Sequence, residues 1–373
     1  MKNIGIYIYD YSLLGGAQKV TYNLANLMFN SGFPIRTVLS YCVEGKINYS
    51  YPKEIEVVNL NYNLENLLEQ INKCNVGNLI VQIENLKLCY EIIQLVRKKS
   101  NCNIIPVLHN SPYYWLRKYY SLSEYFSRPI HILQYLKMRF YWHNLNMKIF
   151  SELTKNTFVC VSERAKKEME QILGNNSLPN VQYIYNPIDI NFGSVDFSSK
   201  KPILIYLGRL STEKRTRTML RIWKKVGNIL PSWTFLIVGD GPDLDQMKKY
   251  VAIHNIQGVI FTGFCSDVYK YLTQSMASIL ISKYEGLPTC MLESCASQNV
   301  LVGCKNDGGL SDILYDGMNG ILLDLDDLDR SADELISLLS NYERMKSLSE
   351  NNSKLFGKFT NQSILDSWKL ILK

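Results

Sequence analysis

Short apolar runs alternate with longer segments of helical periodicity along most of the chain. From Ala17 onward, Val20, Leu24 and Leu27 recur at helical spacing, and Gly32 ends this first helix. Strands are predicted at residues 4–9, 35–40, 57–60, 78–83, 103–109, 157–162, 181–186, 202–207, 234–239, 259–263, 277–281, 300–305 and 321–323. Strands that alternate with helices in this way predict an α/β fold whose parallel sheets are covered by helices on both faces.

The length and one break in the pattern predict two domains. A chain of 373 residues exceeds the usual size of a single domain. The alternation stops at Asn186 and Pro187, and residues 188–201 are polar and irregular, with Gly193 and three serines. We therefore expect one domain over residues 1–190 and a second that begins at residue 191.

Two glutamates, Glu285 and Glu293, flank a short stretch that reads EGLPTCMLE. The apolar run 277–281 before it predicts a strand, and Gly286, Leu287 and Pro288 predict a tight turn. Thr289 then begins a helix, with Pro288 suited to its first turn. The unpaired N–H groups at the start of a helix favour an anion.

A basic loop follows the predicted strand 202–207. It reads GRLSTEK and contains Arg209 and Lys214. An arginine supplies a planar fork of donors and a lysine a mobile point charge, so the two cations together suit a diphosphate. A solvated loop with no ligand is the alternative for such a pair.

The predicted N-terminal domain offers two further candidates at strand ends. Gly15 and Gly16 precede the first helix, in a loop that is not the dinucleotide pattern G-x-G-x-x-G. Glycines permit close approach of another molecule to the backbone. His109 follows the strand 103–109, and ligands on parallel sheets bind beyond the carboxyl ends of strands. An ordinary turn and a structural histidine are the alternatives.

Taken together, GRLSTEK, EGLPTCMLE and the glycine pair in residues 307–310 resemble, in this order, the retaining glycosyltransferases of GT-B architecture, glycosyltransferase family 4. The string GGAQKVTYNLAN resembles the first loop and helix of the same family. The resemblance implies two Rossmann-like domains facing across a cleft, with residues 191–356 binding a nucleotide sugar. It also implies a last helix, 357–373, that crosses back to the N-terminal domain.

The resemblance also assigns roles to residues. It implies that Glu285, His109, Arg209 and Lys214 are the catalytic residues. The donor diphosphate would be bound by Arg209, Lys214, Gly15, Gly16 and the stretch Gly286, Leu287, Pro288, Thr289. Glu293 would hold the ribose, Glu285 would contact the donor sugar, and Gly263 with Phe264 would contact the base. His109, Gly15 and Gly16 would close the site from the other domain. One departure is visible, because Arg215 stands where the family usually has glycine after the lysine.

The implied reaction is transfer of a sugar, with retention, from a nucleotide diphosphate sugar to an acceptor hydroxyl. A UDP-sugar is the default donor on frequency in the family. No cofactor and no metal are expected, since Arg209 and Lys214 can neutralise the leaving diphosphate. Three D-x-D strings, at 243–245, 324–326 and 327–329, predict helix caps or acidic turns.

Residues 112–150 differ from the rest in composition. They carry twelve aromatic residues and six basic residues against one acidic residue, so they hold most of the formal charge of +7. Aromatic and basic residues together suit an anionic membrane surface, and two helices packed into the domain with a basic outer face are the alternative. We expect a lipid-linked or glycan acceptor in surface polysaccharide, lipopolysaccharide or glycolipid synthesis, and no nucleic-acid partner.

Nine cysteines without a C-x-x-C pair, and no apolar run of 18 residues, predict a cytoplasmic protein, peripheral to the membrane at most. Two rival functions stay open. One is a non-catalytic partner subunit of the same fold; the other is a nucleotide-sugar epimerase or a sugar phosphate synthase.

Overall fold

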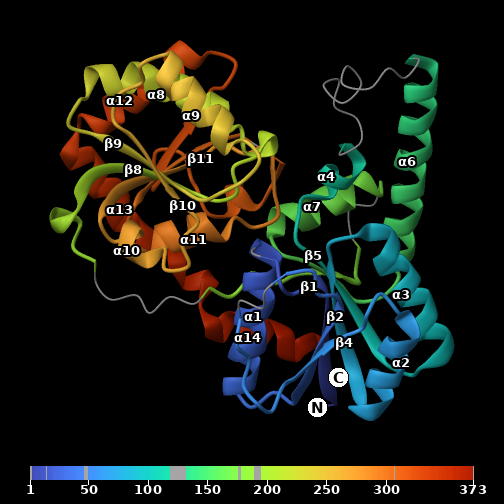
Figure 1. Cartoon of the computed structure of the whole chain (residues 1–373). Coiled ribbons are helices and arrows are strands. Elements are labelled where there is room, and N and C mark those ends of the chain that lie inside the picture. The colour runs from blue at the N-terminus through green and yellow to red at the C-terminus, as the bar shows by residue number, and fades with distance from the viewer. Residues whose placement is uncertain are drawn as a thin grey trace. The chain divides into compact units, whose positions relative to one another are not determined.

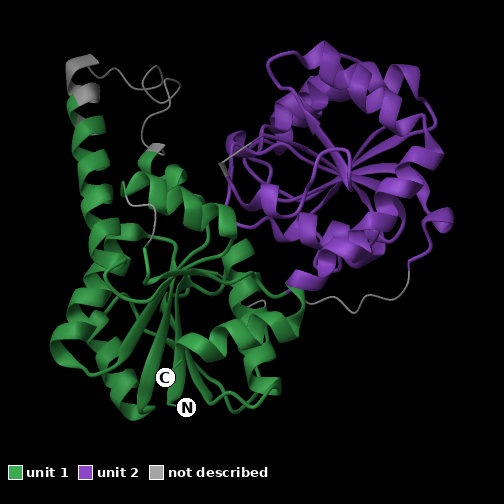
Figure 2. Ribbon diagram, turned by 180° about the vertical axis from the view of Figure 1, so that it is seen from behind, with its two compact units in different colours: residues 1–187, 359–373 green, residues 188–358 purple. Residues whose placement is uncertain are grey.

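A computed structural model describes residues 2–13, 15–45, 49–117, 132–174, 178–188, 195–305 and 307–372. The chain divides into two compact units, residues 1–187 with 359–373 and residues 188–358 (Figure 2). The division falls three residues from one expected boundary (187 against 190) and two from the other (358 against 356). The segment Phe359–Lys373 belongs to unit 1, so the chain returns to that unit after unit 2.

Unit 1 is built on a parallel sheet of seven strands in the order β3-β2-β1-β4-β5-β6-β7. Its strands are β1 (Asn3–Asp10), β2 (Ile35–Cys42), β3 (Glu56–Asn59), β4 (Val76–Ile83), β5 (Asn103–Leu108), β6 (Phe158–Cys160) and β7 (Val181–Tyr183). The strand order reverses between β1 and β4. In open α/β sheets, ligands bind beyond the carboxyl ends of the strands at such a reversal.

The helices of unit 1 are α1 (Gly16–Asn30), α2 (Leu64–Lys73), α3 (Leu86–Lys99), α4 (Pro112–Arg117), α6 (Ile132–Leu153), α7 (Glu163–Ile172) and α14 (Asn361–Ile371). Figure 1 shows α2 and α3 on one side of the sheet and α1 on the other. Side chains of Asn63, Asn85 and Ser162 cap α2, α3 and α7, because each accepts a hydrogen bond from a first-turn N–H.

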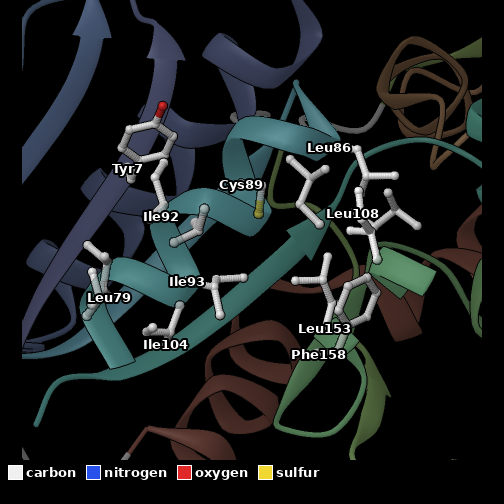
Figure 3. Close-up of a cluster of buried hydrophobic side chains, with 14 of the residues drawn as sticks. Tyr7, Leu79, Leu86, Cys89, Ile92, Ile93, Ile104, Leu108, Leu153 and Phe158 are labelled. Atoms are coloured by element: carbon white, nitrogen blue, oxygen red, sulfur yellow. The ribbon is translucent and has the colours of Figure 1, made fainter. Parts of the chain in front are cut away.

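One cluster of buried apolar side chains in unit 1 lies between the sheet and helices that include α2, α3 and α7 (Figure 3). Leu79 on β4 and Ile104 on β5 are buried in one cluster with Ile92 and Ile93 on α3. Burying one such side chain stabilises the fold by about 1.5–3 kcal/mol. Near-continuous apolar strands such as 79–83 are expected where helices cover both faces of a parallel sheet.

Unit 2 has a parallel sheet of six strands, β10-β9-β8-β11-β13-β15, and a separate pair, β12 with β14. These strands are β8 (Lys201–Leu207), β9 (Thr234–Val238), β10 (Val259–Gly263), β11 (Ser275–Leu280), β12 (Tyr284–Glu285), β13 (Val300–Cys304), β14 (Asp307–Gly308) and β15 (Gly320–Leu323). The order reverses between β8 and β11, so the loops after these two strands are the expected place for a ligand.

The α-helices of unit 2 are α8 (Thr216–Ile229), α9 (Leu244–Ile253), α10 (Tyr269–Leu272), α11 (Thr289–Ala296), α12 (Leu328–Leu339) and α13 (Tyr342–Phe356). Short 3₁₀ helices follow β8 and β14, at Thr212–Lys214 and Gly309–Asp312. Among the described residues of either unit, no helix combines the length and apolar character that a membrane crossing needs.

Candidate functional site

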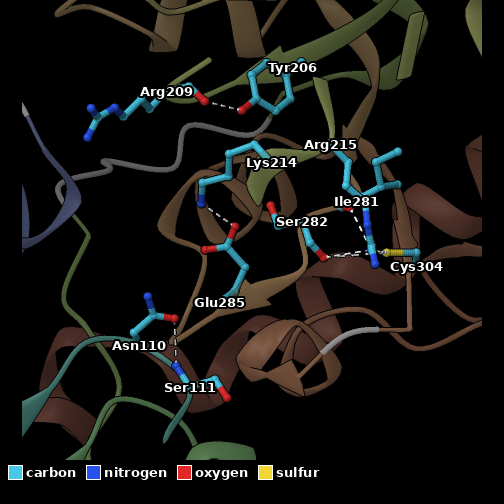
Figure 4. Close-up of polar contacts among 10 residues, drawn as sticks. All are labelled: Asn110, Ser111, Tyr206, Arg209, Lys214, Arg215, Ile281, Ser282, Glu285 and Cys304. Carbon is cyan, nitrogen blue, oxygen red and sulfur yellow. Dashed lines mark hydrogen bonds and ion pairs between the residues drawn. The ribbon is translucent and has the colours of Figure 1, made fainter. Parts of the chain in front are cut away.

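The reversal point of the unit 2 sheet brings two distant loops together. The loop after β8 carries Lys214, and the segment after β11 carries Glu285. Lys214 Nζ lies 2.6 Å from Glu285 Oε1 (Figure 4). The two side chains are only 22% and 11% exposed. A second tie joins the same segments, since the Lys283 N–H donates to the Glu213 carbonyl at 2.8 Å.

The surroundings of Lys214 act on its pKa in opposite directions. Burial by itself lowers the pKa of the ammonium, but the adjacent Glu285 carboxylate raises it more, so the net shift is upward. Lys214 is therefore a fixed positive charge at neutral pH. A buried cation of this kind suits an anionic ligand.

Glycine is required beside Glu285. Glu285 in β12 pairs with Gly308 in β14, and the Gly309 N–H donates to the Gly286 carbonyl at 2.9 Å. Gly308 has φ +104°, and a Cβ there would overlap the Glu285 carbonyl oxygen. Residues 307–308 form a strand because they pair with β12, and a 3₁₀ helix follows.

Glu293 lies on α11, and its side chain is 4% exposed. Gly286, Leu287 and Pro288 are buried, and Thr289 begins the helix. Pro288 was predicted inside the first turn, but it precedes the helix with φ −71° and ψ 97°. Proline loses no helical hydrogen bond here, because the N–H of an N-cap residue has no partner within the helix. The carbonyl of Pro288 accepts from the Met291 N–H at 2.9 Å.

Arg209 is exposed, and the structure does not bring its guanidinium to the Lys214–Glu285 pair. Figure 4 shows the guanidinium pointing away from them. The backbone of Arg209 is held by the buried Tyr206, whose hydroxyl donates to the Arg209 carbonyl at 2.8 Å. The loop is thus held at its backbone by Tyr206, while the Arg209 side chain is exposed to solvent.

Arg215, which stands where the family usually has glycine, differs from its neighbours in backbone conformation and makes contacts of its own. Its backbone is left-handed, with φ 51° and ψ 40°, a conformation that favours glycine. Its Nη1 donates to the carbonyls of Ile281 at 3.2 Å and Ser282 at 3.3 Å, just beyond β11 (Figure 4). It also lies 3.5 Å from the sulfur of Cys304, the last residue of β13. The side chain therefore ties the start of α8 to the ends of two strands.

Gly263 and Phe264 lie at the carboxyl end of β10. Gly263 has φ +74°, and its carbonyl accepts from the Gly239 N–H at 2.9 Å. Phe264 is 54% exposed. An exposed aromatic ring beside the sheet end is available for stacking on a planar ligand.

In unit 1, the predicted residues lie at the corresponding edge of its sheet. Gly15 is the N-cap residue of α1, which begins at Gly16 rather than at Ala17. His109 follows β5, and its Nε2 forms a short hydrogen bond with Gln82 Oε1. Burial lowers the pKa of His109 to about 4, so the imidazole is neutral at pH 7.

The sequence analysis missed a carboxylate at this edge. Glu84 directly follows β4 and accepts hydrogen bonds from the Tyr9 N–H at 3.1 Å and from Gln18 Nε2 at 2.8 Å. Gln18 also donates to the Asp10 carbonyl at 2.9 Å, so Glu84 holds the loop that carries Gly15. Burial raises the pKa of Glu84 to about 7. Its position directly after a central strand was the available signal.

One aspartate of each D-x-D string accepts a hydrogen bond. Asp327 caps α12 by accepting from the Arg330 N–H at 3.0 Å. Asp324 accepts from the Asp326 N–H at 3.1 Å within a turn. Asp243 does not cap α9; its Oδ2 accepts from Thr216 Oγ1 at 2.8 Å instead. In the part of the chain that the structure describes, no three His, Cys, Asp or Glu residues gather as a metal site.

The chain is similar in sequence to known glycosyltransferases. Residues 187–355 match the family described as Glycosyl transferases group 1. An uncharacterized glycosyltransferase of Haemophilus influenzae is 22% identical over 387 residues and covers 100% of both chains. The N-acetylgalactosamine-N,N'-diacetylbacillosaminyl-diphospho-undecaprenol 4-alpha-N-acetylgalactosaminyltransferase of Campylobacter jejuni is 22% identical over 368 residues, covering 96% of this chain and 95% of its own.

Solved structures show the same fold. Sucrose-phosphate synthase from Thermosynechococcus elongatus has a TM-score of 0.80 at 14% identity, covering 99% of this chain and 98% of its own. Anabaena HepE in complex with UDP and glucose has a TM-score of 0.74 at 14% identity, covering 99% of both chains. The predicted fold class, two α/β domains of GT-B architecture, is confirmed.

Proposed function

We propose that this chain, which carries a domain of the glycosyl transferases group 1, is a retaining glycosyltransferase. It moves a sugar from a nucleotide diphosphate sugar, a UDP-sugar, to a hydroxyl of a glycan or lipid-linked acceptor. The process is assembly of surface polysaccharide, lipopolysaccharide or glycolipid. The observation that carries the proposal is the Lys214–Glu285 pair at the reversal point of the unit 2 sheet.

Charge develops on the leaving diphosphate during sugar transfer, and fixed cations that meet this charge lower the barrier most. Lys214 is already desolvated and held, so it needs little reorganisation before reaction. Arg209 supplies the second cation, because its exposed side chain can reorient toward the diphosphate. The amide groups of residues 286–289, at the start of α11, add dipoles of the same sign.

The remaining site residues take the roles that the family resemblance implies. Glu285 contacts the donor sugar, Glu293 holds the ribose hydroxyls, and Gly263 with Phe264 contacts the base. In unit 1, the resemblance gives Gly15, Gly16 and His109 a role toward the donor. A neutral His109 can donate or accept a hydrogen bond to a sugar hydroxyl without adding charge.

Two comparisons support the choice of donor and acceptor. The HepE structure contains UDP and glucose, the two parts of a UDP-sugar. The name of the Campylobacter jejuni relative describes transfer to a glycan on diphospho-undecaprenol, a lipid-linked acceptor. Donor and acceptor of these classes are therefore the first to test with this chain.

A lipid-linked acceptor requires the enzyme to meet a membrane, and α6 supplies a suitable surface. Lys137, Arg139 and Lys148 are exposed on it, together with Phe140 at 70% and Tyr141 at 62%. Each basic residue near an anionic surface contributes about 1 kcal/mol of attraction. Residues 118–131 of the predicted membrane stretch lie outside the described part. We infer a peripheral protein on the cytoplasmic face of the membrane.

The deciding experiment is a binding and hydrolysis screen against UDP-sugars and GDP-sugars, with and without EDTA. We expect one UDP-sugar to bind, insensitive to EDTA, with binding lost in Arg209→Ala and Glu293→Ala. Arg217→Ala removes an exposed arginine of the same unit and serves as the control. Unchanged binding in both site variants, or no nucleotide-sugar binding at all, would favour the non-catalytic partner subunit.

The likeness to sucrose-phosphate synthase keeps a synthase of the same fold as the second candidate. Product analysis separates the two, because a synthase or an epimerase converts the donor without a glycan acceptor. Membrane binding is tested by flotation with vesicles of phosphatidylglycerol and phosphatidylcholine. Failure of the protein to float with the anionic vesicles would contradict the peripheral location.

A further inference from the structure

Three tyrosines lie in a row across the carboxyl ends of neighbouring strands in unit 1. Tyr9 is near the end of β1, Tyr41 near the end of β2, and Tyr62 follows β3. The ring centroids of Tyr9 and Tyr41 are 5.8 Å apart, and those of Tyr41 and Tyr62 are 5.5 Å apart. Because these strands are adjacent in the order β3-β2-β1, the row runs from the reversal point of the sheet to its edge.

The outer tyrosine is held in an unusual conformation. Asn61 and Tyr62 are both left-handed, with φ 51° and 60°. Positive φ is common for asparagine but costly for a bulky aromatic residue. The Tyr62 N–H donates to the Tyr41 carbonyl at 2.8 Å, and this bond fixes the strained backbone. Strain that a structure keeps at an exposed residue indicates a function other than stability.

In this left-handed backbone conformation, the Tyr62 side chain lies in solvent and not in the core. The residue is 55% exposed, and its hydroxyl donates to Glu44 Oε1 at 2.5 Å. Glu44 is itself exposed, and its N–H donates to Asp10 Oδ2 at 3.2 Å. Glu44 therefore places a carboxylate beside the row of tyrosines. Hydrogen bonds hold the residue at both its backbone N–H and its side chain.

Carbohydrate has the matching chemistry. A pyranose presents a face of C–H groups that packs on an aromatic ring, and hydroxyls at its rim that donate to carboxylates. Tyrosine supplies a rigid apolar ring with a polar end, at low entropic cost. The Tyr41 ring stands nearly edge-on to that of Tyr62, with 80° between their planes, so the exposed Tyr62 ring offers its face to one pyranose unit beside Glu44.

We propose that Tyr9, Tyr41 and Tyr62, with Glu44, form a binding subsite for the carbohydrate part of the acceptor. This inference rests on the proposed function, because it places the acceptor chain at the edge of the sheet that also carries Gly15 and His109. The subsite takes a neutral or basic oligosaccharide, since Glu44 and Asp10 repel added negative charge at this edge.

The test uses the intact chain and a printed array of bacterial oligosaccharides, with no nucleotide sugar present. The strongest binder is then titrated by calorimetry against wild type and Tyr62→Gly. Glycine adopts the left-handed backbone without strain, so this variant removes the ring and leaves the fold intact. We expect Tyr62→Gly to bind the oligosaccharide about tenfold more weakly, a typical loss for one aromatic contact.

Two further variants are the controls. Tyr62→Phe keeps the ring and should keep most of the affinity. Tyr183→Ala removes an exposed tyrosine from β7, where its ring pairs with Tyr185, and should bind like wild type. Full affinity in Tyr62→Gly, or no array binding by wild type, would overturn the subsite. Donor hydrolysis on the same preparations reports separately on the proposed function, which fails if no nucleotide sugar is bound or cleaved.

Discussion

Lys214 Nζ and Glu285 Oε1 lie 2.6 Å apart, although the two residues are separated by 71 positions in sequence. The contact exists because β8 and β11 are neighbours in the sheet, so the segments that follow them meet. It places a desolvated cation beside a desolvated carboxylate, and removing either charge leaves the other uncompensated.

Replacing Lys214 with methionine should abolish most activity. The variant lacks the cation that would meet the diphosphate, so we expect hydrolysis of a UDP-sugar to fall by about 100-fold. The control is Lys283→Met, which changes an exposed lysine two residues before Glu285. It should leave the rate within a factor of about two. The proposed role of Lys214 would be excluded by equal rates in the two variants.

Gly308→Ala should destabilise unit 2. An alanine Cβ would overlap the Glu285 carbonyl, and φ +104° is unfavourable for any side chain. We expect the free energy of unfolding to fall by about 2–4 kcal/mol, measured by urea titration. Gly317→Ala is the matched control: φ is +71° there, but no atom lies within 4 Å of the added Cβ, so it should lose about 1 kcal/mol. Similar losses in both variants would show that the close approach to Glu285 is relieved by small shifts.

Two substitutions at Arg215 should separate its backbone strain from its side-chain bonds. Arg215→Ala keeps the left-handed residue and loses the hydrogen bonds to the carbonyls of Ile281 and Ser282. Arg215→Gly loses the same bonds but relieves the strain, which is worth about 1 kcal/mol. We therefore expect Arg215→Gly to be less stable than wild type but about 1 kcal/mol more stable than Arg215→Ala. If the glycine variant were the most stable of the three, the guanidinium contacts would contribute little.

Glu84 should make stability depend on pH. Its pKa is about 7 in the folded chain against an ordinary 4.5, so between these values the folded state binds more protons than the unfolded state. The free energy of unfolding contributed by this group therefore falls as pH rises from 5 to 8. Glu84→Gln should lose this fall, and it should gain about 2 kcal/mol relative to wild type over the same range.

The measurement is urea unfolding of wild type and Glu84→Gln at pH 5, 6, 7 and 8. Only the difference between the two proteins is used, because other groups also titrate over this range. A constant difference at all four pH values would show that Glu84 has an ordinary pKa in the folded chain.

Strand and helix positions were predictable where local patterns dominate. The strand predicted at 4–9 is β1, and the helix predicted between Ala17 and Gly32 is α1, because buried strands and amphipathic helices are specified by their own residues. The short strand 307–308 was not predicted, because Gly308 owes its strand conformation to Glu285, a partner that no local pattern reveals.

The residues of the candidate sites also divide into those that a local motif indicates and those that it does not. Lys214 and Glu285, which the structure brings together, could be proposed from the sequence because each follows a clear strand in a distinctive motif. Glu84 was missed because it belongs to no motif. Its hydrogen-bond partners, Gln18 and Tyr9, lie 66 and 75 positions away in sequence. The tyrosine row was also missed, since Tyr9 and Tyr41 lie in two strands, Tyr62 lies in the loop after a third, and only the sheet order aligns them.

The return of Phe359–Lys373 to unit 1 bears on how the protein is made. The ring of Phe359 lies 4.5 Å from that of Tyr185, and Ile364, Leu365 and Trp368 on α14 are buried. During synthesis, unit 2 leaves the ribosome as one contiguous piece and can fold at once. Unit 1, although translated first, must wait for α14 and hold part of its apolar surface uncovered until then. Chaperone demand should therefore concentrate on the N-terminal half of the nascent chain.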